Sequence, residues 1–147
     1  MKLSILFFFL LAFQSQESQP GIYVVTTPGK KTGCDNQLKM LLGNTKVCIS
    51  KKPIIVVDDI ESVTDIQYEP KIEAFYLDVR FSSKGMQTLN RAIRSFPEIK
   101  FALANSDEVI CIFAVDPEKE IHFIRIGIDE DLEDLKLVHS SLKELIQ

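Results

Sequence analysis

The sequence predicts an α+β fold, in which a single small mixed or antiparallel sheet has helices packed on one face. Three observations predict this fold. Residues 72–81 alternate apolar and mixed side chains with the period of a strand, residues 84–96 repeat apolar side chains at helical spacing, and residues 100–115 have the pattern of a β-hairpin. A helix that connects a strand to a hairpin can lie across one face of their common sheet.

The composition is that of an ordinary globular domain. The chain has 147 residues, of which 46% are hydrophobic and 26% are charged, so we expect one domain. The formal net charge is −4, and acidic and basic residues are interspersed. Because no basic region could bind phosphate backbones, nucleic acid is not an expected partner, and no cofactor is predicted.

Residues 1–18 predict a secretory signal peptide. Lys2 precedes an apolar segment at 3–13, which is shorter than the span of about 20 apolar residues that crosses a membrane. We expect cleavage between Gln14 and Ser18, which would leave an exported protein, periplasmic or secreted, with no membrane attachment. An uncleaved anchor is the alternative, because glutamine is unusual at the last position before such a cut.

Residues 19–52 predict an N-terminal extension with a strand and a short helix. A strand is expected from Gly21, a helix over 35–42 because of its leucine spacing, and a further strand over 46–50. Cys34 and Cys48 flank the helix, and we predict that they form a disulfide in an exported protein. Two separate thiols are the alternative.

Residues 53–147 predict the main α+β domain. The first elements are a short apolar run at 53–57 and a single helical turn at 60–63, which Asp58 or Asp59 can cap. The strand at 72–81 then directs one face into the core, through Phe75, Leu77, Val79 and Phe81.

The opposite face of the strand at 72–81 is mixed in character and includes Tyr76 and Arg80. Such a mixture suits a sheet surface that faces solvent. We therefore predict that Tyr76 and Arg80 form an accessible binding surface.

The remaining elements follow in order. The helix at 84–96 is capped by Ser82 or Ser83, directs Met86, Leu89, Ile93 and Phe96 inward, and stops before Pro97. After the hairpin, the alternation over 121–128 predicts a central or nearly central strand. A final helix begins in an acidic cluster, whose charge the helix dipole favours, and its inward residues are Leu132, Leu135, Val138, Leu142 and Leu145.

The sequence shows no catalytic or metal-binding constellation. His122 and His139 are far apart and lack ligand spacing, so no metal site is predicted. Cys111 lies in an apolar run and is expected to be a buried thiol. A small hydrolase that uses Cys111 or His122 stays open as an alternative function.

Three segments carry a family resemblance: IIVVDDIESV, FYLDVRFSSKGMQTL and FALANSDEVI. Together they resemble the head subdomain of the first periplasmic domain in SecD and SecDF, accessory subunits of the bacterial preprotein translocase. The resemblance extends over about residues 53–128 and implies a head-like α+β fold that contacts polypeptides outside the membrane. The sequence lacks a counterpart of the transmembrane helices of that family, so the resemblance implies at most a binding module.

The sequence therefore predicts an exported, non-enzymatic binding module whose partner is a polypeptide or another protein. A secreted structural or inhibitory domain, similar to the translocase head only in architecture, is the alternative. The sequence predicts no oligomeric state.

Overall fold

The computed structural model describes residues 18–27, 34, 36–127 and 131–147. Within these residues the strands are β1 (Gly21–Val24), β2 (Asn36–Met40), β3 (Lys46–Ile49), β4 (Ile55–Val56), β5 (Ile60–Val63), β6 (Gln67–Glu69), β7 (Ala74–Phe81), β8 (Phe101–Ala104), β9 (Glu108–Phe113) and β10 (Phe123–Ile126). The helices are α1 (Ser83–Ser95) and α2 (Leu132–Leu145), and a 3-10 turn, η1, covers Val57–Asp59. The predicted signal peptide lies, except for Ser18, outside the described residues.

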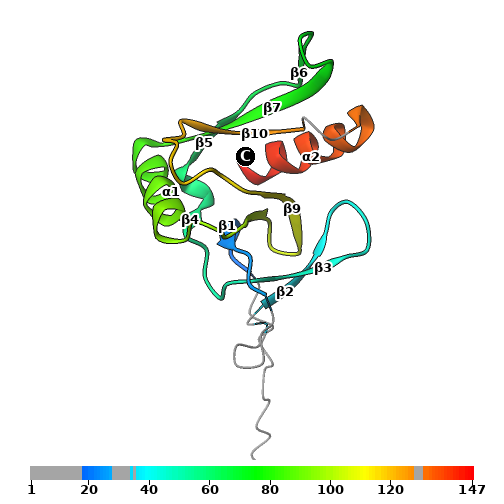
Figure 1. Cartoon of the computed structure of the whole chain (residues 1–147). Coiled ribbons are helices and arrows are strands. Elements are labelled where there is room, and N and C mark those ends of the chain that lie inside the picture. Colours follow the sequence, from blue (N-terminus) through cyan, green and yellow to red (C-terminus); the bar gives the residue numbers. More distant parts are fainter. Residues whose placement is uncertain (1–17, 28–33, 35, 128–130) are drawn as a thin grey trace, which may run out of the picture.

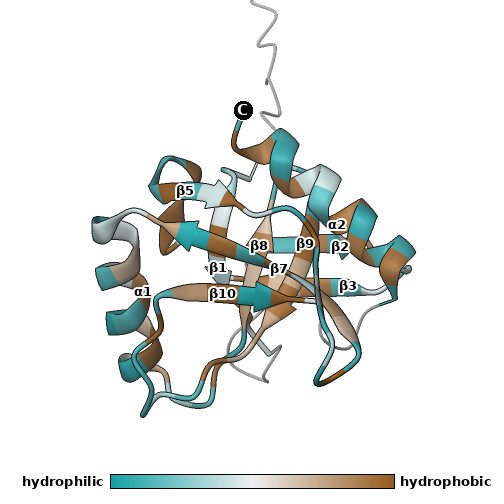
Figure 2. Cartoon of the chain, turned by 90° about the horizontal axis from the view of Figure 1, so that it is seen from above, coloured by the Kyte–Doolittle hydropathy of each residue, from teal (hydrophilic) through white to brown (hydrophobic). Residues whose placement is uncertain are grey.

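The strands form two sheets, one above the other, with α1 and α2 at opposite sides of the space between them (Figure 1). One sheet has six strands in the order β3-β2-β9-β8-β1-β4. The other has the order β10-β7-β5, and β6 also pairs with β7. Figure 2 shows β5, β7 and β10 side by side from above.

The α+β class is confirmed, but the prediction of a single sheet was wrong. α1 connects β7 in one sheet to β8 in the other. One apolar cluster joins both sheets and both helices, through residues that include Leu77, Val79, Leu89, Ile93, Leu103, Ile110, Leu135 and Leu142. Alternation in a sequence shows which side chains face inward, but not which strands are neighbours, so the second sheet could not be predicted from the pattern.

The predicted β7-α1 junction is confirmed. The Ser82 hydroxyl caps α1 by accepting a hydrogen bond from the Gly85 N–H at 3.1 Å. Phe96 differs from the prediction, because α1 ends at Ser95 and the Phe96 side chain is 45% exposed. The hairpin of β8 and β9 is also confirmed, and the Asn105 side chain accepts hydrogen bonds from two backbone N–H groups in its turn.

The short helix predicted over 35–42 was wrong, because residues 36–40 form β2. This strand pairs antiparallel with β3 and parallel with β9. Leu38 packs in a second apolar cluster with Val47 and Val109. Long-range strand pairing therefore overrides the local leucine spacing. The helical turn predicted at 60–63 was also wrong, because the turn occurs earlier, in η1, and residues 60–63 form β5.

The N-terminal segment is built into the six-stranded sheet. The predicted strand is present as β1, which lies between β8 and β4. No helix in the described ranges has the length and apolar character needed to cross a membrane.

β10 is an edge strand, not the central strand that the alternation predicted. It pairs with β7 and is the last strand of its sheet. Its isoleucines are buried because its inner face packs toward α2, and an edge strand can bury one face as well as a central strand. Directly after β10, Gly127 has φ of 109°, and a Cβ there would lie 2.7 Å from Leu135 Cδ1. The chain can thus approach α2 closely only with glycine at this position.

The predicted disulfide between Cys34 and Cys48 is confirmed. Their Cα atoms lie 5.3 Å apart, and 14 positions separate them in the sequence. Cys34 lies just before β2 and Cys48 lies in β3, so the bond links the two outermost strands of the six-stranded sheet.

Reduction of this disulfide should lower the free energy of unfolding by about 3 kcal/mol, because the crosslink restricts the unfolded chain. Urea unfolding of the purified protein, with and without reductant, measures this difference. The Cys111→Ser variant is the control and should respond to reductant like the parent. Equal stability in both conditions would contradict a stabilising crosslink.

Candidate functional site

The face of the four-stranded sheet that points away from the core carries both predicted surface residues. Tyr76 is half-buried and Arg80 is exposed. Phe123 on β10 lies directly opposite Arg80, and Arg125 lies directly opposite Asp78. We refer to Tyr76, Asp78, Arg80, Phe123 and Arg125 as the outer-sheet patch.

A buried ion pair organises the outer-sheet patch. Arg125 donates from Nε to Asp78 Oδ1 at 2.8 Å and from Nη2 to Asp78 Oδ2 at 3.0 Å. Asp78 is only 5% exposed, and its backbone N–H donates to Thr64 Oγ1 at 2.9 Å. The hydrogen bond to Asp78 raises the pKa of Arg125 above its ordinary value, so the guanidinium stays charged. Two-point pairing of this kind fixes the orientation of the guanidinium.

The aromatic side chains of the patch pack around this guanidinium. The Arg125 Cζ atom lies 3.9 Å from the centroid of the Tyr76 ring and 5.3 Å from that of Phe123. The Tyr76 hydroxyl donates to Gln67 Oε1 at 3.0 Å. The Tyr76 ring is therefore held in place by a cation-π contact and a hydrogen bond.

The outer-sheet patch has the chemistry of a protein-binding surface. Phe123 is 39% exposed, and Arg80 has no ion-pair partner among the described residues. Rings and guanidinium groups held in fixed positions can contact a partner with little loss of side-chain entropy. The sequence missed Asp78, Phe123 and Arg125, because only the pairing of β7 with β10 brings them together.

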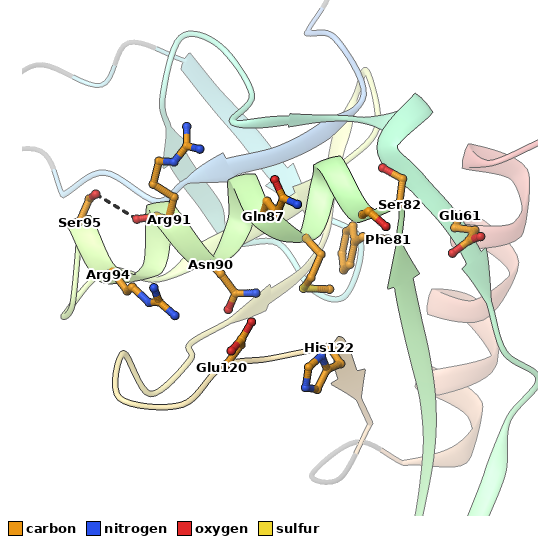
Figure 3. A pocket seen from close by; sticks show the side chains of 12 residues that line it. Glu61, Phe81, Ser82, Gln87, Asn90, Arg91, Arg94, Ser95, Glu120 and His122 are labelled. Atoms are coloured by element: carbon orange, nitrogen blue, oxygen red, sulfur yellow. Dashed lines mark hydrogen bonds between the residues drawn. The ribbon is translucent and has the colours of Figure 1, made fainter.

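A separate hollow of about 850 Å³ lies beside α1 (Figure 3). Its walls carry charges of both signs, from Arg91 and Arg94 on α1 and from Glu120 before β10. Asn90 fixes the far wall, because its side-chain amide donates to the Ile121 carbonyl at 3.0 Å and accepts from the Ile121 N–H at 3.1 Å. The described residues contain no group of three or more side chains that could hold a metal ion.

The structure places the two residues of the hydrolase alternative in different hollows. His122 lines the hollow beside α1, whereas Cys111 lines a cleft between β9 and β10. Cys111 is half-buried, so the prediction of a fully buried thiol was wrong. β9 lines the cleft with residues 110–113, which exposes part of a strand that the apolar run alone would bury completely.

Comparison with solved structures shows a SecDF-like fold. SecDF in its super-membrane-facing form aligns with a TM-score of 0.53 and 11% sequence identity, over 86% of this chain and 19% of that chain. A second structure, described as a membrane component SecDF that enhances protein export, aligns with a TM-score of 0.52 and 9% identity, over 86% of this chain and 63% of that one. The chain thus spans less than two thirds of either structure.

The predicted SecDF-like fold is confirmed, and the likeness covers more of the chain than the resemblance over 53–128. No protein-family model matches the sequence. No curated protein matches it either.

Replacing Arg125 with alanine should lower the free energy of unfolding by about 3 kcal/mol, because Asp78 would stay buried without a partner. The double variant Asp78→Val/Arg125→Met should recover most of this loss, since it removes both charges. Urea unfolding of the variants measures the difference.

Arg80→Ala is the matched control, because it removes an exposed arginine of the same patch and should change stability by less than about 0.5 kcal/mol. Equal destabilisation of the Arg125→Ala variant and the double variant would contradict the importance of the buried pair.

Proposed function

We propose that this chain is an exported, non-enzymatic module that binds polypeptides through the outer-sheet patch. The observation that carries the proposal is the patch itself: rings and arginines that a buried ion pair holds in place on a solvent-facing sheet. A surface of this kind contacts extended chains of varied sequence, because aromatic and guanidinium groups contact both apolar side chains and backbone carbonyls.

The SecDF-like fold supports the same proposal. One structural neighbour is described as enhancing protein export, and we propose by analogy that this chain contacts polypeptides in that context. At identities of 11% and 9%, the likeness itself concerns the fold, so the binding role depends on the patch.

Two observations support export. The Cys34–Cys48 disulfide is of a kind that persists in oxidising compartments outside the cytosol. Residues 1–18 have the pattern of a signal peptide. The proposed location is therefore the periplasm or the exterior of the cell.

The Tyr76→Ala/Arg80→Ala variant should bind a permanently unfolded protein about tenfold more weakly than the parent, because it loses a ring and a cation from the patch. A reduced and alkylated protein is a suitable ligand, and biolayer interferometry measures its binding. Tyr76→Phe should bind like the parent because it keeps the ring.

Arg94→Ala is the matched control, since it removes a cation from α1, outside the outer-sheet patch. Unchanged binding by the Tyr76→Ala/Arg80→Ala variant, with its fold intact by circular dichroism, would refute the patch as the binding surface.

Cross-linking of the tagged full-length protein in cells, followed by mass spectrometry, then tests the setting. Recovery of translocase subunits or of many unrelated exported polypeptides would support the proposal. Recovery of one defined partner would instead favour a structural or inhibitory domain.

A further inference from the structure

The free edge of β10 presents backbone groups in a known direction. The backbone N–H and C=O of Asp78 both bond to Thr64, on the β5 side of β7. Because Arg125 lies directly opposite Asp78, these two residues form a non-hydrogen-bonded pair in the antiparallel ladder. The N–H and C=O of Arg125 therefore point away from β7, and alternation gives Phe123 the same direction.

These groups have no strand as a partner within the part of the chain that the structure describes. β10 is the last strand of its sheet, and β7 is the strand that pairs with it. An edge of this kind can accept a further strand, which would pair with both Phe123 and Arg125.

A cleft of about 510 Å³ lies next to this edge. β10 contributes Ile126, β9 contributes Phe113, and α2 contributes Val138 to its mainly apolar walls. A strand that pairs with β10 directs alternate side chains to opposite faces of the sheet. One set would enter the cleft, and the other set would lie beside Phe123 and Arg125 on the outer-sheet patch.

The charge of the cleft selects among extended segments. Its lining includes two charged residues, Arg125 and Asp134, and the charge of Arg125 is already paired with Asp78. Asp134 has no cation partner among the described residues. A basic side chain at the end of a bound segment could therefore pair with Asp134.

We propose that an extended polypeptide segment with alternating apolar side chains and a basic residue binds by adding a strand to β10. This inference rests on the proposed function and specifies the form in which the polypeptide is bound. Main-chain hydrogen bonds to Phe123 and Arg125 provide affinity for many sequences, while the cleft and Asp134 provide a preference for apolar and basic residues.

Backbone methylation of a peptide tests the strand addition directly. The probe is a fluorescein-labelled peptide of about nine residues with alternating valine and threonine and one terminal lysine, which is long enough to pair with all of β10. Fluorescence anisotropy measures its binding to the purified full-length protein. N-methylation of one alternate set of residues should weaken binding by about tenfold or more, and methylation of the other set should have little effect.

A matched pair of protein variants tests the same bonds from the other side. Phe123→Pro and Phe123→Ala both remove the ring, but only proline removes the N–H that points to the open edge. We expect the proline variant to bind the peptide about tenfold more weakly than the alanine variant. Circular dichroism checks that both are folded, and if the proline variant is not, the methylated peptides decide the question with the parent protein.

Cys111 reports on occupancy of the cleft, which it lines. The bound peptide should slow alkylation of Cys111, and a peptide with glutamate in place of lysine should protect it less. The Asp134→Asn variant should lose this preference for lysine.

Equal weakening by both methylation patterns, or alkylation of Cys111 at the same rate with and without peptide, would overturn the strand addition. If the unfolded protein still binds the outer-sheet patch, the proposed function survives that result. If neither the unfolded protein nor the peptide binds, both proposals fail.

Discussion

The pair formed by Asp78 and Arg125 is the interaction on which the outer surface of this protein depends. It joins β7 to β10 and brings the guanidinium of Arg125 to the Tyr76 ring. A carboxylate as buried as Asp78 is costly without a partner, so the pair also constrains how the two strands align. Surface geometry and sheet register are therefore determined by the same contact.

Local features of the fold could be predicted from the sequence, and long-range ones could not. The Ser82 cap, the inward face of β7 and the turn at Asn105 each depend on neighbouring residues, and the sequence predicted all three. The second sheet and the strand β2 depend on pairing between distant segments, for which alternation contains no information.

The candidate site shows the same division. Alternation along β7 was enough to place Tyr76 and Arg80 on one face, but the character of that face comes from β10. The error over β10 is informative, because one buried row of isoleucines is compatible with a central or an edge position. Only the identity of its neighbours distinguishes the two, and the open edge is what gives the structure a route to bind extended chains.

The contact between Asn90 and Ile121 has a consequence for how this protein can diverge in sequence. The amide of Asn90 bonds to both main-chain groups of Ile121 and so takes the place of a neighbouring strand. Since main-chain groups are common to all residues except proline, position 121 can change its side chain without losing either bond. Position 90 has no such freedom, so drift in the loop before β10 should leave the asparagine on α1 unchanged.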